Sequence, residues 1–228
     1  MHNQPSVSCQ NYQNCTDCFL SCLCLENKRS LPRVYHRGEA LFCSGDKFDA
    51  LYVLKTGSAK SFSNTVDGYE QITNFYFPGD LIGFEAFENM IHVHSLRFLE
   101  YSKVCRISMH DFNQVIVASE PGRRVLLSMM SHSIVDEQQL LQSLVKHDAE
   151  QRLVKFLLNM ADKKKQSTLP IQVVNLSMTR GDIANYLGMA LETTSRLLTK
   201  MHAQGSIKVN KREITLCNVE GLHASLVT

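Results

Sequence analysis

The sequence predicts an α+β protein in which an antiparallel β-roll is followed by a long helix and a winged helix-turn-helix. Three observations predict this order. Strand-like segments alternate with turn signals in the first half, apolar residues then follow a helical period, and the last third contains two short helices and a basic hairpin. The 228 residues are 44% hydrophobic and 20% charged, which is ordinary for a globular protein and sufficient for two small domains.

The strand-like segments lie between Leu31 and Ala118. Turn signals separate them at Gly45-Asp46, at Gly57 and at Pro78-Gly79. Strands at this spacing, with such turns between them, are typical of antiparallel sandwiches and rolls. The expected strands cover residues 39–42, 50–54, 59–62, 71–77 and 95–107.

A helix is expected over residues 119–146, because apolar residues there follow a heptad spacing. The row contains one charged member, Glu137, and its apolar members are Leu127, Met130, Ile134, Leu141 and Leu144. Two interpretations remain open at this point. The row packs on the roll of its own chain, or it pairs with the same helix of a second chain.

The remaining residues, 147–228, predict a winged helix-turn-helix. A helix over 149–160 and a solvated loop over 162–169 come first. A short helix follows, with Thr179 as its N-cap and Gly188 as its stop. The second short helix runs from about Leu191 to Ala203. A hairpin comes last, with strands at 207–209 and 213–216. The expected organisation is therefore an arm (1–30), a roll (31–118), a long helix (119–146) and a DNA-binding domain (147–228).

The second helix of this motif divides into two faces. Leu191, Thr194, Leu197, Leu198 and Met201 are expected in the core, and the opposite face carries Glu192, Ser195, Arg196, Thr199 and Lys200. Arginine can pair with guanine and glutamate with cytosine in a major groove. Residues 147–228 contain 11 Lys and Arg against 7 Asp and Glu, whereas residues 1–146 contain 13 against 15, which favours an anion-binding C-terminal domain. The alternative is a solvated face with a local Glu192–Arg196 pair.

Five of the eight cysteines lie in the first 24 residues: Cys9, Cys15, Cys18, Cys22 and Cys24. The first residues lack the pattern of a signal peptide, and no apolar run is long enough to span a membrane, so a cytoplasmic protein without a membrane partner is expected. In that compartment, crowded cysteines favour metal or cluster ligation over disulfides. Cys43 and Cys217 are expected to be isolated buried thiols.

Several motifs together resemble the CRP/FNR regulators, and among them the FNR type. The resemblance covers nearly the whole chain and rests on Gly68–Thr73, Pro78–Phe84, Met178–Gly188 and Glu192-Thr193-Thr194-Ser195-Arg196. It implies a homodimer that binds double-stranded DNA at inverted repeats of TTGAT and works with RNA polymerase. Ser195 would contact a T, Arg196 the G and Glu192 the complementary base. The further DNA contacts expected are Thr179, Arg180, Thr193, Lys200, Lys208 and Lys211.

The same resemblance gives the cysteines a role. Cys15, Cys18 and Cys24 match the FNR arm, and Cys105 falls where that family places a fourth ligand of an iron-sulfur cluster, of the 4Fe-4S type. Zinc is the alternative, because four thiolates also suit tetrahedral zinc. Cys9 and Cys22 have no counterpart in the pattern. The sequence departs from the family after Cys24, where the segment 25–34 is short, polar and interrupted by a proline.

The expected function is therefore an oxygen- or redox-sensing transcription regulator of anaerobic genes, and not an enzyme, since no catalytic constellation is found. Alternatives are a regulator that responds to thiol redox, to zinc or to a small molecule in the roll, and an iron-sulfur electron carrier. No cyclic nucleotide is expected, because the segment between Glu85 and Leu96 contains no Lys or Arg to hold its phosphate and places His92 near that position. Ile134 and Glu137 are the expected dimer switch, because two carboxylates facing each other would disfavour pairing.

Overall fold

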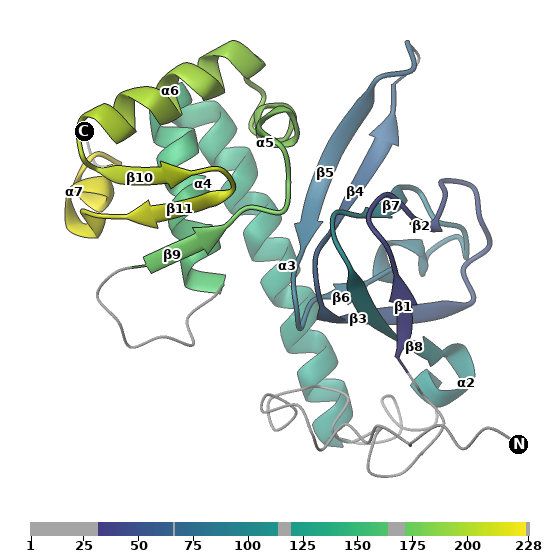
Figure 1. Cartoon of the computed structure of the whole chain (residues 1–228). Helices are drawn as coiled ribbons and strands as arrows, with labels where there is room; N and C mark the ends of the chain where they lie inside the picture. The colour runs from purple at the N-terminus through teal and green to yellow at the C-terminus, as the bar shows by residue number, and fades with distance from the viewer. Residues whose placement is uncertain (1–31, 66, 114–119, 164–171, 227–228) are drawn as a thin grey trace, which may run out of the picture. The chain divides into compact units, whose positions relative to one another are not determined.

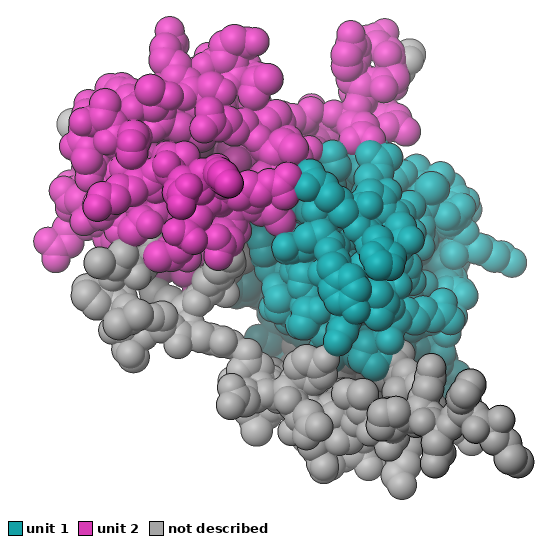
Figure 2. All heavy atoms as spheres, viewed as in Figure 1, with its two compact units in different colours: residues 1–63, 75–134 teal, residues 64–74, 135–228 magenta. Residues whose placement is uncertain are grey.

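The computed structural model describes residues 32–65, 67–113, 120–163 and 172–226. These residues divide into two compact units (Figure 2). The first unit lies within positions 1–63 and 75–134, and the second within positions 64–74 and 135–228. The cysteines of the expected arm, among them Cys15, Cys18 and Cys24, lie outside the described residues.

Two antiparallel sheets make up the roll (Figure 1). One sheet has the order β1-β8-β3-β6, with β1 at Arg33–Tyr35, β8 at Ser102–Ser108, β3 at Ala50–Thr56 and β6 at Leu81–Ile82. The other has the order β2-β7-β4-β5, with β2 at Ala40–Phe42, β7 at Ser95–Phe98, β4 at Ala59–Asn64 and β5 at Glu70–Tyr76. A short 3-10 helix, η3, follows β6 at Phe84–Ala86.

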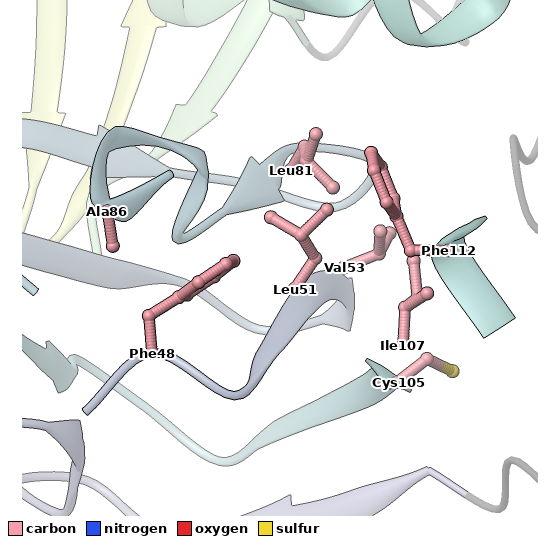
Figure 3. Packing of buried hydrophobic residues seen from close by; sticks show 8 residues of the cluster. All are labelled: Phe48, Leu51, Val53, Leu81, Ala86, Cys105, Ile107 and Phe112. Atoms are coloured by element: carbon pink, nitrogen blue, oxygen red, sulfur yellow. The ribbon is translucent and has the colours of Figure 1, made fainter. Parts of the chain in front are cut away.

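The central strands of the first sheet, β3 and β8, contribute buried residues to both faces. The inner face of this sheet contributes Leu54, Ile82 and Val104 to a core that it shares with residues of the second sheet, among them Leu96 and Phe98. The outer face carries a second cluster, which consists of Phe48, Leu51, Val53, Leu81, Ala86, Cys105, Ile107 and Phe112 (Figure 3). Because successive residues of a strand point to opposite faces, Val104 lies in one core and Cys105 in the other.

Two helices follow the roll. The short α2 spans Met109–Asp111, and the 27-residue α3 spans Glu120–Lys146. Leu126 and Met129 of α3 pack against the outer cluster. Helix α3 therefore has two sets of apolar residues. One set packs on the roll, and the other is the heptad row, which lies on a neighbouring face of the helix. Leu127, Ile134 and Leu141 of that row are exposed.

The second unit contains the predicted winged helix-turn-helix. Helix α4 spans Ala149–Lys163, α5 spans Arg180–Tyr186 and α6 spans Leu191–Ala203. Strands β10 (Ile207–Asn210) and β11 (Glu213–Leu216) form the expected hairpin, and β9 (Gln172–Asn175) pairs with β11. The last helix, α7, spans Val219–Ala224.

The strand expected over residues 95–107 is wrong in one respect, since it is two strands. Residues 99–101 separate β7 from β8, and the amide of Leu99 donates to the carbonyl of Ser58 at 2.9 Å. The two strands belong to different sheets, so the chain must leave one layer and enter the other at this point. The short strands β1, β6 and β9 and the helix α7 were not predicted.

The predicted fold class is confirmed: a roll of antiparallel sheets, a long helix and a C-terminal helix-turn-helix. The predicted domain boundaries after residues 30, 118 and 146 stay predictions. Within the described part of the chain, no helix combines the length and the apolar character needed to cross a membrane.

Candidate DNA-reading surface and cysteine site

Helix α5 begins at a capping box. The hydroxyl oxygen of Thr179 accepts from the amide of Asp182 at 3.0 Å, and the Asp182 carboxylate accepts from the amide of Thr179 at 2.8 Å. Both bonds satisfy amides that a helix start leaves unpaired. The predicted N-cap is therefore confirmed. Thr179 and Arg180 are both exposed at this end of the helix.

Helix α6 has a buried face and an exposed face, as the sequence predicts. Thr194, Leu197, Leu198 and Met201 are buried. Glu192 and Arg196 are exposed near the start of the helix, and Thr193 and Ser195 are partly buried beside them. The prediction was wrong for Leu191, which is 47% exposed, because it is the first residue of the helix.

The hairpin places two further cations at the surface. Lys208 on β10 and Lys211 in the turn are both exposed, and Lys211 adopts a positive φ of 53°. His202 of α6 holds the hairpin through its Nδ1 atom, which accepts from the amide of Val209 at 3.3 Å. The second unit thus presents exposed cations on the helix and on the hairpin, an arrangement suited to a phosphate backbone.

One predicted phosphate contact already has a partner. The Nζ atom of Lys200 lies 2.6 Å from the carboxylate of Glu150 on α4. Both side chains are partly exposed, so the pair contributes little to stability. Sequence reasoning missed Glu150, because the two residues are 50 positions apart.

Tyr186, the last residue of α5, has an unusual environment. Its ring packs edge-on against Phe156 of α4, with centroids 6.1 Å apart. Burial, followed by the charges of Asp136 and Glu137 on α3, raises the pKa of Tyr186 to about 12. The side chain that was expected to switch dimerisation, Glu137, is thus exposed on α3 and close enough to act on a tyrosine of the helix-turn-helix.

This raised pKa predicts a pH dependence of stability. The ordinary pKa is 10.0, so between about pH 10 and 12 the folded protein keeps a proton that the unfolded chain loses. The stabilisation is complete below pH 10 and is lost as the pH rises through 12, by about 3 kcal/mol in total. Urea unfolding at about pH 9 and about pH 11.5 should show a smaller loss for Tyr186→Phe than for the wild type. Equal losses would contradict the prediction.

In the roll, His92 lies close to where a CRP-like nucleotide phosphate would be expected. It is buried, and its ring stacks on Phe42 with centroids 3.6 Å apart. Its Nδ1 atom lies 3.3 Å from the carboxylate of Glu85. An aromatic stack and a carboxylate occupy this position, and neither favours a buried phosphate. The expected lack of cyclic-nucleotide binding stays a prediction.

Cys105 is the one predicted cluster ligand within the described residues. It is 1% exposed and lies at the edge of the outer cluster in Figure 3, with its sulfur turned away from Leu51 and Phe48. No group of three potential metal-ligating side chains occurs in the ranges that the structure describes. Cys43 and Cys217 are exposed, so the expectation that both are buried was wrong.

Strand β1 lies beside Cys105. Arg33 of β1 pairs with Val104, the residue before Cys105. The pairing is antiparallel, so β1 begins at the position next to Cys105 on β8. The described chain therefore begins close to the one predicted ligand on the roll.

Two family models match the chain. A Crp-like helix-turn-helix domain covers residues 151–225, and a cyclic nucleotide-binding domain covers residues 32–119. The fumarate and nitrate reduction regulatory protein of Yersinia pestis is 35% identical in an alignment that covers 92% of this chain and 88% of that protein. The anaerobic regulatory protein of Haemophilus influenzae is 34% identical over 92% of this chain and 86% of its own length.

The structure of FixK2 from Bradyrhizobium japonicum is similar as a whole. It superposes with a TM-score of 0.77 at 26% identity, over 86% of this chain and 96% of that one. The relatives named above are regulators, in agreement with the prediction that the chain is not an enzyme. With an FNR-like relative matched over nearly its whole length, the chain belongs to the CRP/FNR family of helix-turn-helix transcription regulators.

Proposed function

We propose that the protein senses oxygen or redox state through an iron-sulfur cluster and, as a homodimer, controls anaerobic genes from inverted repeats of TTGAT. The observation that carries this proposal is the place of Cys105, on a roll strand beside the point where the N-terminal chain enters. Two relatives named for fumarate and nitrate reduction and for anaerobic regulation support the anaerobic role. RNA polymerase is the expected protein partner.

The length of chain between Cys24 and the roll is compatible with a cluster that includes Cys105. Cys24 precedes Arg33 by nine residues, and nine extended residues span at most about 30 Å. Arg33 pairs with Val104, the residue before Cys105. The segment from Cys24 to Arg33 therefore ends next to Cys105. Cys15, Cys18 and Cys24 would supply three thiolates and Cys105 the fourth, the usual donor set of a 4Fe-4S cluster. When bound, such a cluster supplies sulfides that oxygen attacks.

Replacement of the ligands tests the cluster. Serine at Cys15, Cys18, Cys24 or Cys105 is expected to abolish anaerobic iron binding, because each change removes a thiolate. Iron and sulfide are measured after anaerobic purification, together with the absorption spectrum. The matched controls are Cys9→Ser and Cys22→Ser, which should retain iron.

Two results would contradict the ligand assignment. One is a Cys105→Ser protein that binds iron normally. The other is a wild-type protein that contains zinc and no iron, which would favour the tetrahedral zinc site instead.

The exposed row on α3 supports a dimer. Three exposed residues of α3 repeat at heptad spacing: Leu127, Ile134 and Leu141. They and the nearby Val145 are between 51% and 85% exposed. An apolar row of this kind on a surface marks an interaction site, and the same helix of a second copy is self-complementary to it. Sedimentation velocity of the anaerobic protein is expected to give a dimer. Asp substitution at Ile134 should then give monomers.

The reading roles of α6 give a further prediction. Arg196→Ala is expected to cost about 1 to 3 kcal/mol of binding and to relax discrimination at one base pair, because its guanidinium would contact a G. The control is Lys208→Ala, which should weaken all sequences alike and reduce the salt slope by about one. Gel shifts on variant half-sites measure both. An Arg196→Ala protein with unchanged base preference would rule out this role.

A further inference from the structure

Arg152 of α4 contacts the turn of the helix-turn-helix. Its Nη1 atom donates to the carbonyl of Leu187 at 2.7 Å and lies 3.4 Å from the carbonyl of Gly188. Leu187 is the C-cap of α5, and α6 begins at Leu191, so the guanidinium binds the segment that joins the two helices.

The contact is chemically favourable. The last carbonyls of a helix have no partner within the helix and carry partial negative charge, so a cation there is stabilising. Gly188 has a φ of +60°, and a Cβ atom at this position would lie 3.5 Å from Nη1 and 3.8 Å from Leu144. The guanidinium therefore lies against the backbone of the turn. Its Nε atom is buried and has no hydrogen-bond partner among the described residues, while the side chain as a whole is partly exposed.

Other bonds also hold the two ends of the turn. The Asn185 side chain donates to the carbonyl of Glu70 at 2.7 Å, and the Thr194 hydroxyl donates to the carbonyl of Ala190 at 3.4 Å. Ala190 is the N-cap of α6 and makes no side-chain hydrogen bond. The amide of Met189 is held by a backbone bond to Ala184 at 2.8 Å. Farther along α6, Lys200 is paired with Glu150, two residues before Arg152. Helix α4 thus contacts the turn before α6 through Arg152 and α6 itself through the partly exposed Glu150–Lys200 pair.

We infer that Arg152 is a positioning residue for DNA reading: by fixing the turn between α5 and α6 it sets the angle at which Glu192 and Arg196 are presented. The inference relies on the DNA-binding role of the helix-turn-helix and not on a cluster or on a particular DNA site. Arg152 does not touch DNA in this role. The alternative role of an arginine in such a domain is a phosphate contact, and the two roles predict different results.

The experiment compares Arg152→Met, Arg152→Lys and wild type in the full-length protein. The control is Lys155→Met, which removes a cation of the same helix that bonds the carbonyl of Gln139 and not the turn. Hydrogen exchange at the amides of Gly188 and Met189 reports on the turn without DNA. Binding to a TTGAT inverted repeat and to an unrelated duplex, each at several salt concentrations, reports on reading.

We expect exchange at the turn to rise about tenfold or more in Arg152→Met, because a hydrogen bond from a charged group is lost. Binding to the specific site should fall about 10- to 100-fold, with binding to the unrelated duplex and the salt slope unchanged. Arg152→Lys should lie between Arg152→Met and wild type, and Lys155→Met should exchange as wild type does. If Arg152→Met does not fold, the comparison of Arg152→Lys with Lys155→Met and wild type tests the inference.

Unchanged exchange at the turn in both Arg152 variants would overturn the inference. If the salt slope also falls by about one, the result identifies Arg152 as a phosphate ligand. If wild type does not prefer the TTGAT repeat, the proposed DNA site is wrong, and the exchange measurement still decides on Arg152.

Discussion

Gly57→Ala is expected to destabilise the roll by about 3 kcal/mol, the sum of a backbone and a steric cost. Gly57 has a φ of +89°, which an L-residue with a Cβ adopts only at a cost. The added Cβ would lie 2.6 Å from the carbonyl oxygen of Tyr101 and 2.8 Å from the Cα of Ser102. Both are backbone atoms of the adjacent segment of the same chain, and they cannot move away by rotation of a side chain.

Gly38→Ala is the matched control. Its φ of +88° is nearly the same, and no atom lies within 4 Å of the position its Cβ would take. It should therefore show the backbone cost alone, about 1 kcal/mol. The chain contains no tryptophan, so circular dichroism in urea is the suitable measurement. Equal losses for the two variants would mean that close packing at Gly57 has no energetic consequence.

Leu198→Ala is expected to destabilise the helix-turn-helix by about 2 to 5 kcal/mol, because it leaves a cavity in a packed core. Leu198 is 2% exposed on the buried face of α6. A loss of this size approaches the whole stability of a small unit, which is about 5 to 15 kcal/mol. DNA binding should therefore be lost at temperatures where the wild type binds.

The control on the same helix is Leu191→Ala, which removes the same atoms from a side chain that is 47% exposed. It should change stability by no more than about 0.5 kcal/mol. Thermal unfolding by circular dichroism, followed by gel shifts at low temperature, separates unfolding from a lost DNA contact. A similar loss of stability in both variants would mean that burial on α6 does not determine its stability.

The sequence predicted features that depend on neighbouring residues. The capping box at Thr179 and the helix stop at Gly188 are local chemistry, and both are present. Leu191 was placed in the core because its spacing fits the buried face. Periodicity gives the direction of a side chain but not whether the neighbouring element extends far enough to cover it, and at the first residue of α6 it does not.

Features that depend on distant residues left no signal in the sequence. Lys200 pairs with Glu150, and Arg152 reaches Leu187 across 35 positions. The exposure of Cys43 and Cys217 was also missed, because cysteine is most often buried and the sequence does not show which turns and strand ends lie at the surface. The predicted base-reading and cluster residues were found by their motifs, and their roles stay predictions.

In the centre of the first sheet, apolar residues point to both faces and so specify the alignment of the strands only weakly. When one face of a sheet is exposed to solvent, a shift of the strand register by one residue would expose apolar side chains. The alternation of apolar and polar residues therefore disfavours such a shift. In β8 both Val104 and Cys105 point into apolar cores, and a slip would exchange them without exposing either. Gly57 fits closely against Ser102 at the first residue of β8, and this close approach favours one alignment of the two segments. Gly57, a residue without a side chain, thus helps to determine the face of the sheet on which the Cys105 thiol lies.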